Sequence, residues 1–312
     1  MVDTHSLSLT VEPGVAARLM RRASLASMSV ATILIVTKGL AWLITDSVGM
    51  LSSLVDSAID LVSSLITFIA IRQALVPADE DHRFGHGKAE ALAGMAQAGF
   101  IAASAGGLVL TVADRFLHPR PVQEEFIGVA VSAFAIVLTL ALMLFQSHVV
   151  RKTNSIAIGA DKAHYTTDFV TNIAVGAGIL ASSRLDQPVI DLVVAAGVAI
   201  YLVIGAWGIG RTSIDVLMDR ELPERDREHI LDIVQRQPGV RSVHDLRTRS
   251  AGLKQFIQLH VVLHPTMSLG RAHVISDTIQ AAIEEAFPQA EVILHIDPRD
   301  DSGTNATNAQ TA

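Results

Sequence analysis

The chain has 312 residues, and half of them are hydrophobic, which is too apolar a composition for an ordinary soluble domain of this size. It has no cysteine, which excludes disulfides and thiolate metal sites, and its formal net charge of −7 argues against a nucleic-acid partner. Apolar residues are concentrated between about Ala23 and Val216, whereas the sequence after Asp219 has the mixed charge of a soluble domain.

Six apolar runs, each near or above the roughly 20 residues that a bilayer core requires, predict a domain of six membrane-spanning helices over residues 23–215. A polar N-terminal tail, residues 1–22, precedes the first of them. The runs are approximately Ala23–Ile44, Val48–Val76, Ala89–Phe116, Phe126–Val150, Ile156–Ser182 and Val189–Trp207. Most of the Lys and Arg residues that flank the spans fall on the side of the N-terminal tail, so both termini are expected to be cytoplasmic.

The second span contains two carboxylates, Asp56 and Asp60, whose spacing of four residues places them on one helix face. His164 and Asp168 repeat this spacing in the fifth span. Asp56 lies nine residues after the outer start of its span and His164 nine residues after the inner start of its own. At 1.5 Å per residue both lie about 13 to 14 Å deep, near the middle of the bilayer.

These four side chains would form one cluster if the second and fifth spans are neighbours. Three oxygen ligands and one nitrogen suit a tetrahedral, zinc-like divalent ion. A single intramembrane acid could equally serve helix packing or line water, but two matched pairs at one depth favour a metal site. Three carboxylates against one divalent ion leave about one surplus negative charge. Without metal, crowded carboxylates in a low-dielectric site favour protonation, so the cluster predicts a metal/proton antiporter.

The loop after the second span offers another candidate cluster, Asp79, His82 and His86. The spacing would align these ligands on a helix, although Gly85 and Gly87 favour a turn, and loop histidines beside acids are often only solvated polar residues. The segment lacks the glutamate of the zinc-protease helix motif, so an enzyme of that class is not supported.

Residues 216–298 have the pattern of a small cytoplasmic α+β domain with a ferredoxin-like open sheet and helices on one face. The expected elements are a helix over Glu224–Gln237, strands over Val240–Arg249 and Gln255–Leu263, a helix over Leu269–Phe287 and a strand over Glu291–Ile296. Alternation along the strands lets His244, His260, His295 and Asp297 share the polar face. Exposed strand histidines are often plain surface residues. The tail, residues 299–312, is small and polar and is expected to be disordered.

The chain resembles the cation diffusion facilitators, specifically their bacterial zinc and ferrous-iron efflux branch, from about Ala23 to Pro298. The resemblance rests on four segments in the right order: Val55–Asp60, Pro77–Asp79 through His86–Glu90, His164–Asp168 and His244–Arg249. The sequence departs from many eukaryotic zinc members in lacking a histidine-rich loop between the fourth and fifth spans.

The resemblance implies a homodimeric, proton-coupled exporter in a bacterial inner membrane. Its transport site would be Asp56, Asp60, His164 and Asp168, and its loop site Asp79, His82 and His86. A binuclear cytoplasmic site in the dimer interface would use His244, His260, His273, His295 and Asp297, with Asp297 bridging.

Zinc is the leading substrate, and ferrous iron and cadmium are possible because the same donor set accepts them. Two alternatives remain at this point. One is a metal-sensing membrane scaffold that transports nothing, and the other is a proton-coupled exporter of organic cations.

Overall fold

The structure, a computed structural model, describes residues 11–46, 48–117, 126–185 and 189–298. The chain divides into two compact units, Leu9–Met218 and a second unit that contains Asp219–Ala312. The regular elements described in the first unit are all helices, and the described strands all belong to the second. The predicted tail over residues 299–312 lies outside the described residues.

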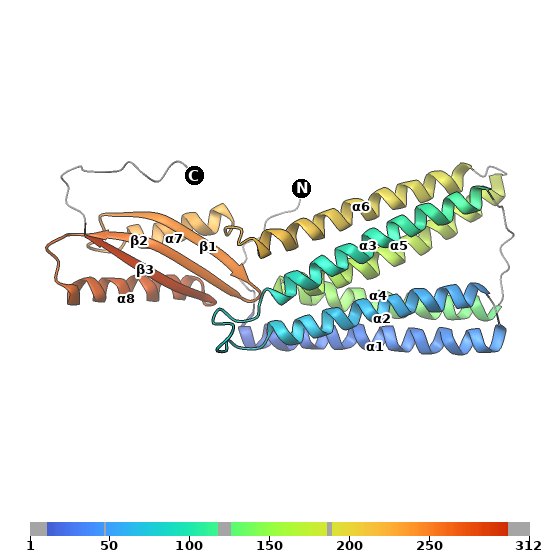
Figure 1. Ribbon diagram of the computed structural model, residues 1–312, viewed down its shortest axis with the longest axis horizontal. Coiled ribbons are helices and arrows are strands. Elements are labelled where there is room, and N and C mark those ends of the chain that lie inside the picture. The colour runs from blue at the N-terminus through green and yellow to red at the C-terminus, as the bar shows by residue number, and fades with distance from the viewer. Residues whose placement is uncertain (1–10, 47, 118–125, 186–188, 299–312) are drawn as a thin grey trace. The chain divides into compact units, whose positions relative to one another are not determined.

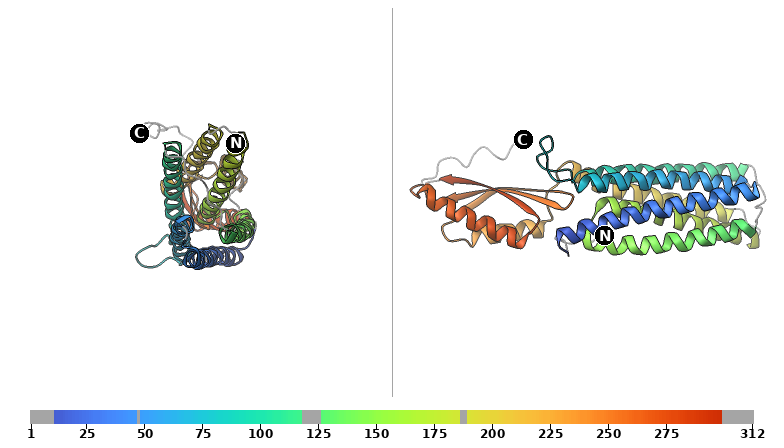
Figure 2. Two further views of the ribbon diagram at one scale, coloured as in Figure 1. Left: turned by 90° about the vertical axis from the view of Figure 1, so that its right-hand side faces the viewer. Right: turned by 90° about the horizontal axis from the view of Figure 1, so that it is seen from below.

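The described part of the first unit contains six long helices, which run side by side in Figures 1 and 2. They are α1 (Pro13–Thr45), α2 (Val48–Ala74), α3 (Ala89–Leu117), α4 (Phe126–Thr153), α5 (Ile156–Leu185) and α6 (Val189–Leu217). Within the described ranges, all but α5 are long and apolar enough to cross a membrane. Helix α5 is the more polar one because it carries Asp161, Lys162, His164 and Asp168.

Two of these helices extend well beyond the apolar runs in the sequence. Helix α1 begins at Pro13, ten residues before the predicted span, because proline is well accommodated in the first turn of a helix. Helix α6 continues to Leu217, ten residues past Trp207. Hydropathy marks the part of a helix that suits lipid, whereas the backbone hydrogen bonds continue beyond it.

The helices of the first unit pack closely inside and are apolar outside. Helix α2 packs against α1, α3 and α5. At the α3–α6 contact, a Cβ atom on Gly94 would meet the Ser213 side chain and lie 3.0 Å from Cγ2 of Ile156, so a larger residue there requires these neighbours to shift. Leu43, Leu110 and Trp207 are each more than 70% exposed, which suits a surface in contact with lipid tails.

The second unit has the predicted order of elements and completes the predicted fold class. It comprises α7 (Glu224–Gln235), β1 (Ser242–Ala251), β2 (Lys254–Leu263), α8 (Leu269–Ala286) and β3 (Ala290–Pro298). The sheet order is β1-β2-β3, with β1 antiparallel and β3 parallel to β2. Ile257 and Leu259 of β2 share one buried core with Ile230 of α7 and Ile279 and Ile283 of α8. Both helices therefore cover the same face of the sheet, and the other face is left for polar side chains.

Candidate metal centres

The first candidate centre lies between α2 and α5, inside the helical unit. The Nε2 atom of His164 is 3.2 Å from Oδ1 of Asp60 and 3.5 Å from Oδ2 of Asp168. One ligand atom from each of these three residues lies within 4.8 Å of the others. His164 is only 2% exposed, and the edge of its ring meets Phe100 of α3 at a centroid distance of 6.2 Å. Two helices far apart in sequence thus present a compact set of nitrogen and oxygen donors.

Asp56, the fourth residue of the predicted cluster, lies one turn away from Asp60 along α2 and is exposed. It interacts electrostatically with Asp60 but is not part of the compact group of donors. The structure therefore brings together three of the four predicted transport residues. Two polar atoms of the group, His164 Nδ1 and Asp168 Oδ2, are buried and make no hydrogen bond among the described residues. Buried polar atoms of this kind are costly unless a partner such as a cation reaches them.

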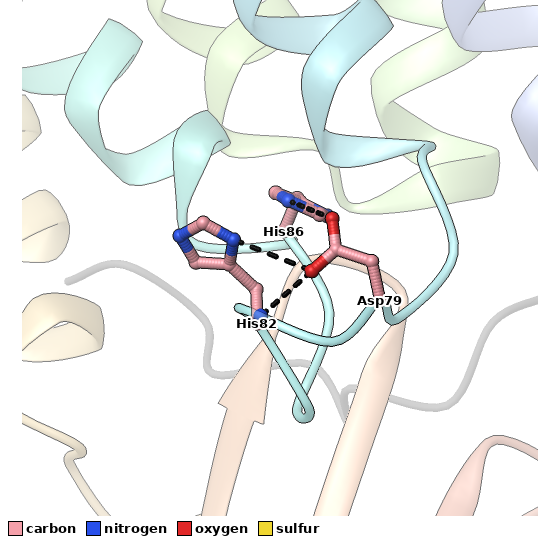
Figure 3. Close-up of side chains that lie close together, drawn as sticks. All are labelled: Asp79, His82 and His86. Atoms are coloured by element: carbon pink, nitrogen blue, oxygen red, sulfur yellow. Dashed lines mark hydrogen bonds and ion pairs between the residues drawn. The ribbon is translucent and has the colours of Figure 1, made fainter.

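The second candidate centre lies in the loop between α2 and α3 (Figure 3). Oδ1 of Asp79 is 3.5 Å from Nδ1 of His82, and Oδ2 of Asp79 is 3.3 Å from Nε2 of His86. The segment is a turn and not a helix, as its glycines favour, and Gly85 adopts a φ of 81°. The backbone N–H of His82 donates to Asp79 over 2.7 Å, and this hydrogen bond lowers the pKa of the Asp79 carboxyl below its usual value. The carboxylate is therefore ionised and available to a metal at neutral pH.

The third candidate centre lies on the polar face of the sheet. His244, His260 and His295 occupy facing positions on β1, β2 and β3, because the strand register pairs His260 with both of the others. Asp297, two residues along β3, lies at their centre. Its carboxylate oxygens are 3.2 Å from His244 Nε2, 3.1 Å from His260 Nδ1 and 3.2 Å from His295 Nε2. Burial alone would raise the pKa of Asp297, but the hydrogen bond from His260 and the nearby imidazoles outweigh it and lower that pKa.

His273, the remaining member of the predicted cytoplasmic set, is not brought to this face by the chain itself. It lies on α8, is 74% exposed, and its Nδ1 is 3.5 Å from Oδ1 of Asp277. Asp245, which the sequence did not single out, lies near the cluster instead. It follows His244 at an irregularity in the β1–β2 pairing and has a φ of 50°, and its Oδ2 is 3.7 Å from His260 Nε2.

Two models of protein families match the chain. A family model of the cation efflux transmembrane domain matches residues 24–218, and one of the cytoplasmic domain of cation efflux proteins matches residues 222–299. The chain belongs to the cation efflux family. This confirms the resemblance to the cation diffusion facilitators.

Relatives in this family match over most of their length. The cation-efflux pump FieF of Cronobacter sakazakii is 43% identical over 281 residues, which cover 90% of this chain and 93% of that protein. FieF of Salmonella choleraesuis is 41% identical over 285 residues, again 90% of this chain and 93% of that protein. A solved chain of the zinc form of CzrB is 30% identical and covers 28% of this chain and 99% of its own, with a TM-score of 0.26.

Membership of the cation efflux family makes the chain a multi-pass transporter of divalent metal cations and not an enzyme. Metal efflux is therefore its function, and the two alternatives, a metal-sensing scaffold and an exporter of organic cations, are set aside. The group of Asp60, His164 and Asp168 is called the membrane cluster below. Two further charged residues of this cation efflux transporter lie close to it and were not predicted from the sequence.

The first of them is Asp161, which is fully buried on α5. Four other helices supply donors to its carboxylate: Ser27 of α1 at 2.6 Å, Gln146 of α4 at 2.7 Å, and Thr67 of α2 and Gln97 of α3 at 3.4 Å each. The sequence carries a signal for it, because Asp161 precedes His164 by three residues and Asp168 by seven and so shares their helix face. Its hydrogen bonds hold the helices of the transporter together around that face.

The second is Lys38 of α1. Its Nζ donates to Ser57 Oγ over 2.7 Å and to the Ser53 carbonyl oxygen over 3.2 Å, and both acceptors belong to α2. A charged residue inside an apolar span is by itself a signal of function, and this one could have been found in the sequence on that ground.

Proposed function

We propose that this transporter binds its metal ion at Asp60, His164 and Asp168, with Asp56 as the fourth ligand, and exchanges that ion for protons. The observation that carries the proposal is the group of three donors within 4.8 Å between α2 and α5. A ligand set built from two helices can be opened to either side of the membrane by a change in their packing, which transport requires.

Zinc is the substrate that this donor set favours. One imidazole nitrogen together with carboxylate oxygens suits four-coordinate zinc, and manganese prefers oxygen ligands alone. Ferrous iron and cadmium accept the same ligands, so we expect them to compete with zinc. The FieF relatives are cation-efflux pumps, a name that leaves the ion open.

Protons are the ions that these carboxylates would exchange for the metal. Three neighbouring carboxylates in a low-dielectric site repel one another when no metal is bound, and proton binding relieves the repulsion. A metal ion has to displace those protons before it can bind. In a bacterial inner membrane with an acidic outer side and both termini cytoplasmic, the inward flow of protons would drive the metal outward.

The two clusters outside the membrane spans fit the same function. We propose that Asp79, His82 and His86 bind metal on the cytoplasmic side, and that His244, His260, His295 and Asp297 hold structural zinc. Asp297 already contacts three histidines, which suits a bridging carboxylate of a binuclear site. His273 is exposed and lies apart from this cluster. In a homodimer, His273 would instead reach the cluster of the second copy of the chain.

The test is metal flux into proteoliposomes under an imposed pH gradient, with zinc, iron, cadmium and manganese compared at equal concentration. We expect wild-type flux to follow the gradient and to be greatest for zinc. His164→Ala should reduce the flux to the level of protein-free vesicles, because it removes the only nitrogen donor of the described cluster.

His148→Ala is the matched control, since His148 is an exposed histidine on α4, another helix of the bundle. It should transport as wild type does. Wild-type flux in His164→Ala would show that the ion crosses elsewhere, and a zinc flux that ignores the pH gradient would disprove proton exchange.

A further inference from the structure

The candidate transport site has a resident positive charge beside it. The Nζ of Lys38 reaches from α1 to α2, where it is held by the Ser57 hydroxyl at 2.7 Å and the Ser53 carbonyl oxygen at 3.2 Å. Ser57 is fully buried. The ammonium group is therefore fixed at one place and not free to move to the membrane surface as a long side chain otherwise would.

The two acceptors of Lys38 are neighbours of the transport carboxylates. Ser57 directly follows Asp56 and precedes Asp60 by three residues on α2. The charge of Lys38 interacts with Asp60, Asp56 and Asp168, which are the three carboxylates of the proposed site. Among the described residues, Lys38 Nζ donates hydrogen bonds to Ser57 and Ser53 and not to these carboxylates, so its influence on them is that of a nearby charge.

The charge balance of the site is incomplete without this lysine. Asp56, Asp60 and Asp168 carry three negative charges when ionised, and a divalent cation cancels two of them. The ammonium group of Lys38 cancels the third. A site that is neutral with its ion bound is far less costly inside a membrane than one with a surplus charge.

On the basis of the proposed function above, we propose that Lys38 is the built-in counter-charge of the transport site and sets how tightly the site holds its divalent ion. A transported ion has to bind firmly enough to enter and weakly enough to leave. A fixed positive charge beside the site repels the bound cation and so speeds its release. The metal ligands thus determine which ion binds, and Lys38 determines how readily it is released.

The experiment compares Lys38→Gln with Lys38→Arg in proteoliposomes by initial rates of zinc transport. Glutamine keeps a hydrogen-bond donor for Ser57 but removes the charge, whereas arginine keeps the charge. We expect Lys38→Gln to lower KM for zinc by roughly tenfold, which is about 1.4 kcal/mol, and to lower kcat as well, because release becomes slower. Lys38→Arg should stay close to wild type in both values.

Thr37→Val is the matched control, because the Thr37 hydroxyl donates to the Ile33 carbonyl oxygen of its own helix. It should leave KM and kcat unchanged. A loss of purely structural hydrogen bonds would raise KM or reduce the amount of folded protein, whereas loss of the counter-charge lowers KM and kcat together. Unchanged values in Lys38→Gln would overturn the proposal.

Asp168→Asn separates this proposal from the one on which it rests. If Asp168→Asn abolishes zinc transport while Lys38→Gln behaves as wild type, the transport site stands and the role of Lys38 is wrong. If Asp168→Asn transports zinc normally, the transport site itself is wrong, and the inference about Lys38 is overturned with it.

Discussion

The membrane cluster and the sheet cluster use the same two kinds of ligand in opposite proportions. Between α2 and α5, one imidazole, His164, stands with the carboxylates of Asp60 and Asp168. On the sheet, one carboxylate, Asp297, stands with three imidazoles. In the membrane cluster, His164 and Asp168 are brought together by the i, i+4 spacing of a helix. On the sheet, the histidines are brought together by facing positions on paired strands.

The difference in the proportion of imidazole and carboxylate ligands indicates what each cluster is suited to do. A carboxylate-rich site among apolar helices is highly charged when it is empty, so it has to take up protons when its metal leaves. An imidazole-rich site can stay neutral without metal, and its histidines are 34% to 65% exposed, so water can solvate it. The membrane cluster is therefore suited to exchange, and the sheet cluster is suited to hold an ion in place.

The largest effect should come from removing a carboxylate of the membrane cluster. Asp60→Ala removes the only α2 member of the described donor group, and we expect it to abolish both zinc transport and the release of protons that zinc addition causes. A pH-sensitive dye inside proteoliposomes measures that release. Asp232→Asn on α7, which only breaks an exposed pair with Arg236, should behave as wild type. Proton release that persists in Asp60→Ala would contradict a shared metal and proton site.

A change of ligand type tests the comparison more sharply than a deletion. Asp168→His gives the proposed site two imidazoles and two carboxylates, which is closer to the proportion in the sheet cluster. We expect zinc still to bind, but fewer protons to be released per ion and transport to fall at least roughly tenfold, because the emptied site takes up fewer protons. Asp168→Glu keeps the charge and should retain more transport than Asp168→His. Equal transport and equal proton release in these two variants would show that the proportion of carboxylates is irrelevant.

The sequence predicted most of the fold because its signals are local. Apolar runs located the six helices, and alternation along the strands placed His244, His260 and His295 on one face. The i, i+4 spacing found both halves of the membrane cluster. Packing of α2 against α5, which joins the halves, is a long-range contact that the spacing required but could not demonstrate.

The rest of the site depends on contacts between helices, which leave a weak trace in one sequence. Asp161 is held by donors from four other helices, and no spacing within α5 reveals those partners. Lys38 looks like an isolated charge in the first span until its bond to Ser57 is seen. The position of Asp56 outside the compact donor group was not predictable either, since the helix spacing alone groups it with Asp60.

The smallest effect on transport should come from the sheet cluster. Asp297→Asn weakens the one carboxylate shared by three histidines, so we expect zinc to bind there at least roughly tenfold less tightly. Zinc at about a hundred times its Kd stabilises a protein by roughly 2.7 kcal/mol, and a tenfold weaker Kd at the same zinc concentration lowers this to roughly 1.4 kcal/mol, so the zinc-dependent rise in unfolding temperature should fall by about half in the variant.

Transport by Asp297→Asn should nevertheless remain measurable and still follow the pH gradient, because the exchanging carboxylates of α2 and α5 are untouched. Glu284→Gln, an exposed change on α8, is the control for the loss of a negative charge from the same unit. If Asp297→Asn abolished transport as fully as Asp60→Ala does, an ion on the sheet would be a required step of export. The division between an exchanging site and a holding site would then fail.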